Sequence, residues 1–246
     1  MARELLTARL ARKECISELS QCYHFKFVID ELECFLYDPG QFVSGVALDE
    51  NGKQQTRAYS MASAANKNRF ELCVNRVEEG FFSNHLANLP DLPIGGTIQI
   101  HGPHGHFTLC EPFTDSILIA TGTGIAPMRS YLQWLFPVDG PDRSNGKQVW
   151  LVYGTRYAED IYYREEFEQM AAEHPNFHYI STLSRPPATW SGGRGYVQEH
   201  VRRIVAGRND MHVYICGLNE MVSSMRTLLI EECGWDKKRV IYERYD

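Results

Sequence analysis

The sequence predicts two domains of different architecture: an antiparallel β-barrel over residues 1–112, followed by a doubly wound α/β domain over residues 113–246. The first half consists of short segments of alternating hydrophobicity separated by turn residues, a pattern typical of antiparallel strands. The second half alternates buried apolar runs with longer segments of helical period, as in a parallel sheet with crossover helices. A chain of 246 residues is long enough for both domains.

The alternating segments of the first half predict the strands of a small closed barrel. Those segments include residues 24–29, 41–43, 56–60, 70–74 and 97–100. Glycine- and proline-containing turns separate them, namely 38–40, 51–52, 95–96 and 102–103. One short helix is predicted within this half, over residues 83–89.

The apolar runs of the second half predict a five-stranded parallel sheet. Its strands are expected at residues 117–120, 148–153, 178–182, 211–216 and 239–242. The helices between them are expected at residues 126–135, 160–173, 197–206 and 220–232. In a doubly wound domain of this kind, ligands bind at the carboxyl ends of the strands.

Composition argues against several classes of protein. With 25 basic and 31 acidic residues, the chain has no basic excess that would indicate a nucleic-acid-binding surface. No apolar run is long enough to span a membrane, and the N-terminus is charged, so we expect a cytoplasmic protein. The seven cysteines are scattered, without the spacing of a disulfide framework, a zinc site or an iron–sulfur cluster. Any iron–sulfur carrier is therefore expected to be another protein.

A glycine-rich loop follows the first predicted strand of the α/β domain. After residues 117–120 come Thr121-Gly122-Thr123-Gly124-Ile125-Ala126-Pro127, which turn on two glycines into a helix. Glycine lets the backbone approach a ligand closely, and the free amides at a helix N-terminus attract anions, so the loop suits a nucleotide phosphate. Tight packing without a ligand is the alternative explanation for the two glycines.

A second candidate site lies on the predicted strand Arg57-Ala58-Tyr59-Ser60. Arg57 and Tyr59 share one face of the strand, where a guanidinium suits a pyrophosphate and a phenol ring suits a flat heterocycle. An ordinary barrel strand would also explain four such residues. Downstream, Gly80-Phe81-Phe82-Ser83 opens the short predicted helix and offers a second cluster of anion-binding amides. Two such features in one barrel favour a cofactor that contains a pyrophosphate.

Together these motifs resemble the ferredoxin–NADP reductase family, in the family's order and over nearly the whole chain. The resemblance rests on Arg57–Ser60, residues 71–76, residues 80–86, the loop 121–127, residues 214–217 and the ending Tyr242-Glu243-Arg244-Tyr245. It implies one noncovalent FAD, a reduced nicotinamide nucleotide as hydride donor, and a ferredoxin–NADP(+) reductase type of activity.

The resemblance also implies residue roles around the flavin. Tyr59 would pack on the isoalloxazine, Arg57 would hold the pyrophosphate and Ser60 would lie near flavin N5. Cys73, Val74 and Asn75 would line the flavin edge, and Ser83 would bond the pyrophosphate. The remaining residues implied to contact FAD are Ala58, Gly80, Phe81 and Phe82.

Hydride transfer needs the nicotinamide stacked on the flavin at near-attack distance. The resemblance implies that Cys216 and Gly217 lie against the nicotinamide, and that Glu243 and Ser60 complete a polar chain beside flavin N5. Tyr245 would cover the flavin face and move aside as a gate. This chain departs from the plant pattern because Asp246 follows that tyrosine. A buried structural thiol and an unstructured terminus are the simpler explanations for Cys216 and Tyr245.

The nucleotide is expected to be NADPH, with NADH as the alternative. A 2′-phosphate calls for guanidinium groups, whereas a carboxylate usually holds a ribose diol. The residues that resemble a 2′-phosphate site are Arg156, Ser184, Arg185 and Arg194. Glu159 and Asp160 lie in the same region and favour NADH.

The expected redox partner is a ferredoxin or a flavodoxin. Arg202-Arg203 and residues 237–239 offer positive charge for an acidic carrier, although solvated surface explains such clusters as well. Two alternatives remain: an NADH-dependent reductase component of an oxygenase, and a flavin-binding regulatory subunit without turnover. We expect a monomer or weak homodimer. We also expect no metal site, because a turn explains the spacing of His101, His104 and His106 better than zinc does.

Overall fold

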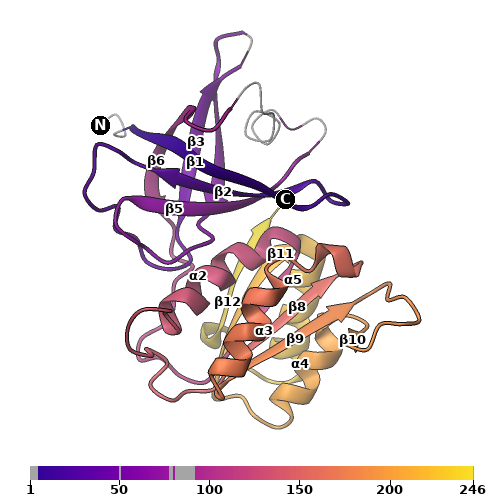
Figure 1. Cartoon of the computed structure of the whole chain (residues 1–246). Coiled ribbons are helices and arrows are strands. Elements are labelled where there is room, and N and C mark those ends of the chain that lie inside the picture. Colours follow the sequence, from indigo (N-terminus) through magenta and orange to yellow (C-terminus); the bar gives the residue numbers. More distant parts are fainter. Residues whose placement is uncertain (1–4, 50, 78–79, 81–91, 246) are drawn as a thin grey trace. The chain divides into compact units, whose positions relative to one another are not determined.

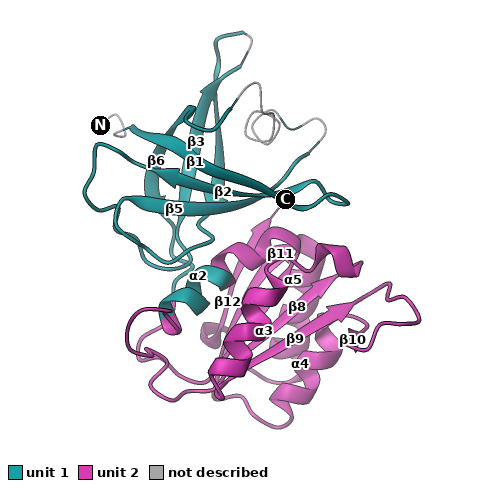
Figure 2. Cartoon of the chain, in the orientation of Figure 1, with its two compact units in different colours: residues 1–108, 129–134 teal, residues 109–128, 135–246 magenta. Residues whose placement is uncertain are grey.

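A computed structural model describes residues 5–49, 51–77, 80 and 92–245, and these residues form two compact units (Figures 1 and 2). Unit 1 comprises residues 1–108 together with Arg129–Trp134, and unit 2 comprises residues 109–128 and 135–246. The helix predicted over residues 83–89 lies outside the described residues.

Unit 1 is a six-stranded antiparallel barrel. Along the sheet the order is β4-β3-β6-β1-β2-β5. The strands are β1 (Leu6–Ser17), β2 (Cys22–Val28), β3 (Phe42–Leu48), β4 (Gln54–Ser60), β5 (Arg69–Asn75) and β6 (Thr97–His104). Immediately after β4, Met61 forms a bridge with Leu72 of β5, and the Ala62 amide donates to the Glu71 carbonyl at 2.7 Å. These contacts join the two edge strands and close the barrel, as the sequence predicts.

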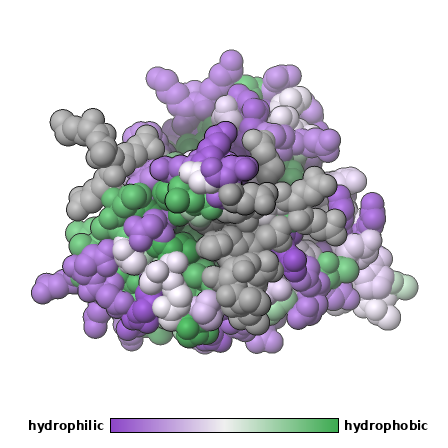
Figure 3. All heavy atoms as spheres, turned by 90° about the horizontal axis from the view of Figure 1, so that it is seen from above, coloured by the Kyte–Doolittle hydropathy of each residue, from purple (hydrophilic) through white to green (hydrophobic). Residues whose placement is uncertain are grey.

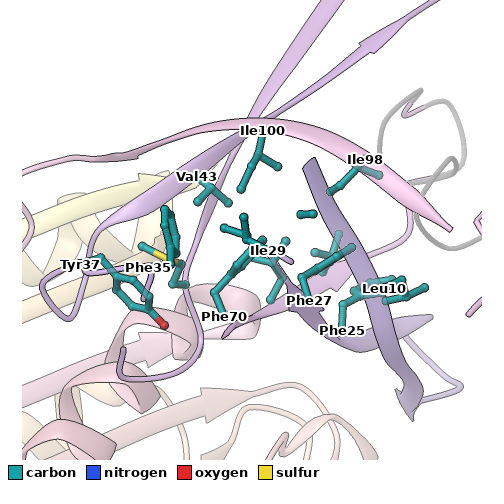
Figure 4. Close-up of a cluster of buried hydrophobic side chains, with 14 of the residues drawn as sticks. Leu10, Phe25, Phe27, Ile29, Phe35, Tyr37, Val43, Phe70, Ile98 and Ile100 are labelled. Atoms are coloured by element: carbon teal, nitrogen blue, oxygen red, sulfur yellow. The ribbon is translucent and has the colours of Figure 1, made fainter. Parts of the chain in front are cut away.

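The barrel interior is filled with aromatic and branched side chains (Figure 4). Phe25 and Phe27 alternate with polar residues along β2, so both point inward. Phe27 stacks on Phe70 of β5 with ring centroids 5.3 Å apart. This pattern of alternate burial fixes the register of β2 against β5, because a slip by one residue would turn every aromatic ring outward.

Unit 2 is built on a parallel sheet with the order β10-β9-β8-β7-β11-β12. The strands are β7 (Ser116–Thr121), β8 (Val149–Thr155), β9 (Phe177–Leu183), β10 (Gly193–Arg194), β11 (His212–Leu218) and β12 (Val240–Tyr245). The five predicted strands are confirmed, but the prediction of a five-stranded sheet is wrong by one strand. β10 is a two-residue pairing of loop backbone with the end of β9, too short to leave a hydrophobic pattern.

Helices cover both faces of this sheet, as the doubly wound prediction requires. They are α2 (Ile125–Leu135), α3 (Arg164–Glu173), α4 (Val197–Val205) and α5 (Asn219–Arg226), the last continuing as a π-helical segment over Thr227–Glu232. Short 3₁₀ segments occur at Gly122–Gly124, Ala158–Asp160 and Lys237–Arg239. Buried residues of α4 and α5 share one cluster with Ile117 and Ile119 of β7. On the other face, Phe167 of α3 packs on Tyr179 of β9.

On the face shown in Figure 3, hydrophilic side chains surround a group of apolar side chains. All seven cysteines are free thiols. Within the described residues, no helix is long and apolar enough to cross a membrane.

Candidate functional site

The first part of the candidate site is the end of β4 in unit 1. Ser60 pairs with Phe42 of β3, whereas the next residue, Met61, bridges β5, so the chain changes partners between Ser60 and Met61. Tyr59 packs against the barrel core, while Arg57 is exposed and donates to the Thr56 carbonyl at 2.8 Å. Burial raises the pKa of the Tyr59 phenol, which outweighs the opposing charge of Arg57. This strand therefore carries an exposed guanidinium at Arg57 and a neutral aromatic ring at Tyr59.

The neighbouring part of unit 1 is β5, which carries three predicted flavin contacts. Cys73 and Val74 are buried and Asn75 is half-buried. Gly80 is also half-buried, and its amide donates to the Val77 carbonyl at 2.8 Å. The predicted contacts Phe81, Phe82 and Ser83 lie outside the described residues.

Residues from α2 hold the segment that follows Ser60. Arg129 donates to the Ala62 carbonyl at 2.6 Å, and the Ser130 hydroxyl donates to the Ser63 carbonyl at 2.6 Å. The Ala64 amide donates to the Gln133 side chain at 3.2 Å. Sequence reasoning missed this anchor, since the interacting residues are more than 60 positions apart.

Arg129 also belongs to a group of charged side chains around Glu71 of β5. Its guanidinium donates to Glu71 at 2.7 Å, and Lys26 and His24 of β2 lie 3.0 and 3.5 Å from the same carboxylate. Burial alone would raise the pKa of Glu71, but Arg129 and the β2 partners outweigh it and lower that pKa. The carboxylate is therefore ionised at neutral pH and holds β2, β5 and Arg129 together.

The glycine loop of unit 2 packs directly on the end of β11. A Cβ atom on Gly124 would collide with the Cys216 carbonyl, and one on Gly217, whose φ is +147°, would collide with the Thr121 hydroxyl. Close packing therefore requires glycine at positions 124 and 217. For Gly124 this agrees with the alternative explanation, tight packing without a ligand. Gly122 differs, because its φ is +54° and a Cβ there would meet nothing within 4 Å. The Cβ position of Gly122 therefore faces open space, although its carbonyl accepts from the Tyr153 hydroxyl at 3.1 Å.

The end of β7 carries a buried polar group that has no partner among the described residues. This group is the Thr121 hydroxyl. A buried hydroxyl without a partner is costly, so such a group usually marks a bound water or ligand. It stands directly before Gly122, where a dinucleotide phosphate is expected to bind.

Cys216, Glu243 and Tyr245 come together at the carboxyl ends of two adjacent strands. In the parallel register, Cys216 of β11 pairs with Glu243 of β12, and Leu218 pairs with Tyr245. Burial raises the pKa of the Cys216 thiol well above its usual range, and the charge of Glu243 raises it further. The thiol is therefore protonated at neutral pH and presents a neutral, polarisable surface. Ser60, the fourth predicted catalytic residue, belongs to unit 1.

Three of the four predicted 2′-phosphate residues lie together after β8 and β9. The Ser184 amide donates to the Thr155 carbonyl at 3.0 Å, and the Arg185 amide donates to the Arg156 carbonyl at 3.1 Å. Arg185 also donates to the Tyr157 hydroxyl at 3.2 Å. Sequence reasoning missed Tyr157, although its position directly after Arg156 was a usable signal.

Arg194 has different partners. Its guanidinium donates to the carbonyls of Pro187, Ala188 and Trp190, the shortest of these bonds being 2.7 Å to Trp190. These bonds stabilise the loop between β9 and β10.

His101 and His104 form a pair at the end of β6, where the prediction of a turn at residues 102–103 is wrong because the strand continues to His104. The ring nitrogens Nδ1 of His101 and Nε2 of His104 are 2.7 Å apart, a hydrogen-bonded separation. Among the described residues, no group of three or more His, Cys, Asp or Glu side chains could hold a metal ion.

Two family descriptions match successive parts of the chain. Residues 7–109 match the oxidoreductase FAD-binding domain, and residues 118–227 match the oxidoreductase NAD-binding domain.

Whole-length relatives match as well. Ferredoxin–NADP reductase B of Sorangium cellulosum is 41% identical over 223 residues, covering 87% of this chain and 87% of the relative. NADH-cytochrome b5 reductase 1 of Laccaria bicolor is 34% identical, covering 90% of this chain and 71% of the relative. The structure of Plasmodium falciparum ferredoxin-NADP+ reductase with 2′P-AMP shares the fold, with a TM-score of 0.81 at 24% identity, covering 98% and 97% of the two chains.

Proposed function

Because the chain belongs to the ferredoxin–NADP reductase family of FAD- and NAD(P)-dependent oxidoreductases, we propose that it transfers hydride between NADPH and FAD and exchanges single electrons with a ferredoxin or flavodoxin. The observation that best supports the nucleotide half of this proposal is the loop at the end of β7. There the Thr121 hydroxyl is buried without a described partner, and the next residue, Gly122, faces open space at its Cβ position.

Unit 1 would bind the FAD. The exposed Arg57 would hold the pyrophosphate, the neutral ring of Tyr59 would pack on the isoalloxazine, and Ser60 would lie near N5. Bound FAD would supply the chemistry that converts a hydride, which carries two electrons, into single-electron transfers. The contacts from Arg129 and Ser130 to residues 62–63 would keep the end of β4 in place.

Unit 2 would position the nucleotide. Thr121–Gly124 would bind its phosphates, and the neutral Cys216 thiol would contact the nicotinamide without placing a negative charge beside the departing hydride. Glu243 would act as a polar group beside Cys216, its neighbour in the register. Tyr245 would act as the gate, so deletion of Tyr245 and Asp246 should change nucleotide affinity. Unaltered kinetics in that variant would contradict the gate.

NADPH is the proposed nucleotide because two arginines and a serine lie together in the loops after β8 and β9. Backbone hydrogen bonds place Arg156 beside Arg185 and Ser184 beside Thr155. A guanidinium matches the geometry and charge of a phosphate dianion. Equal catalytic efficiency with NADPH and NADH, or a preference for NADH, would overturn this choice.

A ferredoxin or flavodoxin is the proposed partner, and the cytoplasm remains the expected compartment. Support for the partner comes from relatives named ferredoxin–NADP reductase. The basic clusters support it less, because Arg202 pairs with Glu232 and Arg239 donates to the Asp210 carbonyl. Docking through these clusters should weaken as ionic strength rises.

An NADH-dependent reductase component of an oxygenase system is the second candidate. The 34% identical relative named NADH-cytochrome b5 reductase favours NADH in this alternative. Steady-state turnover with each nucleotide and each purified carrier separates the candidates. Turnover with NADPH and ferredoxin or flavodoxin supports the first, whereas turnover confined to NADH and an oxygenase component supports the second. A regulatory subunit would show neither.

A further inference from the structure

Two cysteines of the barrel are in sulfur–sulfur contact. The Sγ atoms of Cys22 and Cys73 are 3.6 Å apart. Cys22 is the first residue of β2 and is fully buried, while Cys73 lies in β5 and is 6% exposed. The two residues are 51 positions apart in the sequence, so the fold creates this pair.

The strand register explains the contact. Cys22 pairs with Asn75 and Cys73 pairs with His24, which makes the two cysteines diagonal neighbours on one face of the β2–β5 ladder. The opposite face carries Phe25 and Leu72, which belong to the barrel core. The thiols therefore lie on the outer face of the barrel wall, on the same face as Glu71 and its cations.

We propose that Cys22 and Cys73 are a site of oxidative modification, at which a hydroperoxide converts the two thiols reversibly into a disulfide. The thiolate of Cys73 attacks a peroxide oxygen, the O–O bond breaks, and a sulfenic acid and one water form. The Cys22 thiol then attacks that sulfur, the S–O bond breaks, and the disulfide forms with loss of a second water. Two thiols lose two electrons and two protons, and one hydrogen peroxide becomes two waters. A dithiol reverses the reaction by exchange.

Exposure determines the order of these steps. Cys73 keeps some contact with solvent, so it meets the small oxidant first, whereas Cys22 is fully enclosed and serves as the resolving thiol. A metal ion is a weaker explanation for the pair, because the described residues contain no group of three or more suitable ligands.

Closing the disulfide must move the end of the ladder. The sulfur atoms have to approach by about 1.5 Å to reach a bond length of about 2.05 Å. Diagonal neighbours also have Cα atoms about 7–8 Å apart, slightly more than a relaxed disulfide spans. The strands can adjust here because the β2–β5 ladder ends at Cys22 and Asn75, beyond which one backbone bond, from the Arg76 amide to the Gln21 carbonyl, follows at 2.9 Å. Val74 and Asn75, which continue β5 beyond Cys73, would shift with it.

This movement gives the modification a consequence, which rests on the proposed function. Cys73, Val74 and Asn75 are the proposed contacts at the flavin edge, so a shift of this strand end should weaken FAD binding. Oxidation at the pair would then release cofactor, and reduction would restore binding.

Mapping of the thiols tests the site itself, independently of flavin. Purified FAD-loaded protein is treated with hydrogen peroxide, and after removal of the peroxide it is unfolded, alkylated and digested without reduction. We expect seven reactive thiols before oxidation and two fewer afterwards, with a linked peptide pair that contains Cys22 and Cys73 and separates on reduction with dithiothreitol. Oxidation that leaves Cys22 alkylated while Cys73 becomes sulfinic acid would overturn the proposal, and so would loss of other thiols before these two.

Variants separate the site from its consequence. The exposed Cys34→Ser serves as the matched control and should still form the linked peptide. Cys22→Ala should bind FAD normally before oxidation and should form no linked peptide. If the wild type forms the disulfide but retains FAD as well as the reduced protein does, the consequence for FAD is wrong and the site stands. If the reduced protein fails to bind FAD, the proposed function fails and the thiol map remains decisive for the site.

Discussion

Arg129 donates its guanidinium to the Glu71 carboxylate at 2.7 Å, and the two side chains are only 10% and 13% exposed. Glu71 comes from β5, whereas Arg129 comes from the helix that follows the glycine loop. The same guanidinium binds the Ala62 carbonyl. The Arg129 side chain therefore pairs with the buried Glu71 carboxylate and also donates to a backbone carbonyl of the segment that closes the barrel.

Removal of Arg129 should destabilise unit 1. Arg129→Ala leaves the Glu71 carboxylate with Lys26 and His24 alone, so we expect the free energy of unfolding in urea to fall by about 3 kcal/mol. Arg9→Ala is the matched control, because the Arg9–Asp30 pair has a similar distance of 2.6 Å on the surface and should matter little. Equal decreases in the free energy of unfolding in the two variants would show that burial does not determine how strongly the Arg129–Glu71 pair stabilises the protein.

The charge of Glu71 should make the stability of the barrel depend on pH. The pKa of this carboxyl is lowered in the folded protein, so its contribution is complete above its unfolded pKa of about 4.5 and disappears as pH falls through the folded pKa. In Glu71→Gln this contribution is missing. The difference in melting temperature between wild type and Glu71→Gln should therefore shrink on acidification. A difference that stays constant from neutral to strongly acid pH would contradict this assignment.

Cys216 should resist alkylation in the folded protein. Burial, followed by the charge of Glu243, raises the pKa of its thiol, and only the thiolate reacts with iodoacetamide. A brief treatment near neutral pH should therefore label the exposed Cys34 and leave Cys216 unlabelled, as read by peptide mass spectrometry. In urea-unfolded protein both should react. Early labelling of Cys216 in folded protein would mean that the thiol is accessible and ionised.

Tyr157 should contribute to nucleotide preference through Arg185. Its hydroxyl accepts a 3.2 Å hydrogen bond from that guanidinium, and Tyr157→Phe removes the bond while keeping the ring. We expect KM for NADPH to rise about twofold to tenfold, the effect of one ordinary hydrogen bond, with KM for NADH unchanged. In an Arg185→Ala background, Tyr157→Phe should have no further effect. An equal change in KM for both nucleotides would refute a role in 2′-phosphate selection.

Much of the fold is predictable from local pattern. Alternating hydrophobicity along β2 and β5 reflects strands with one buried face. The continuous apolar runs of β7, β8 and β11 reflect strands that are buried on both faces, so the sequence predicts all five of these elements. β10 is not predicted because a strand of two residues is too short to show a hydrophobic pattern.

Side-chain pairing across the fold was harder to predict. The motifs place Thr121 and Cys216 at strand ends, which a sequence can indicate by position alone. The Arg129–Glu71 bond joins residues 58 positions apart, and the Cys22–Cys73 contact depends on strand register. Neither leaves a local signal, because both arise from the three-dimensional arrangement of distant segments.

The most direct test of the central claim is an anaerobic titration of the purified protein with NADPH, followed through the visible absorbance of the flavin. The account predicts a yellow protein with about one FAD per chain, whose absorbance bleaches rapidly as NADPH is added and recovers when oxidised ferredoxin or flavodoxin is supplied. Protein that is colourless and cannot take up added FAD would contradict it, as would bound flavin that neither NADPH nor NADH reduces.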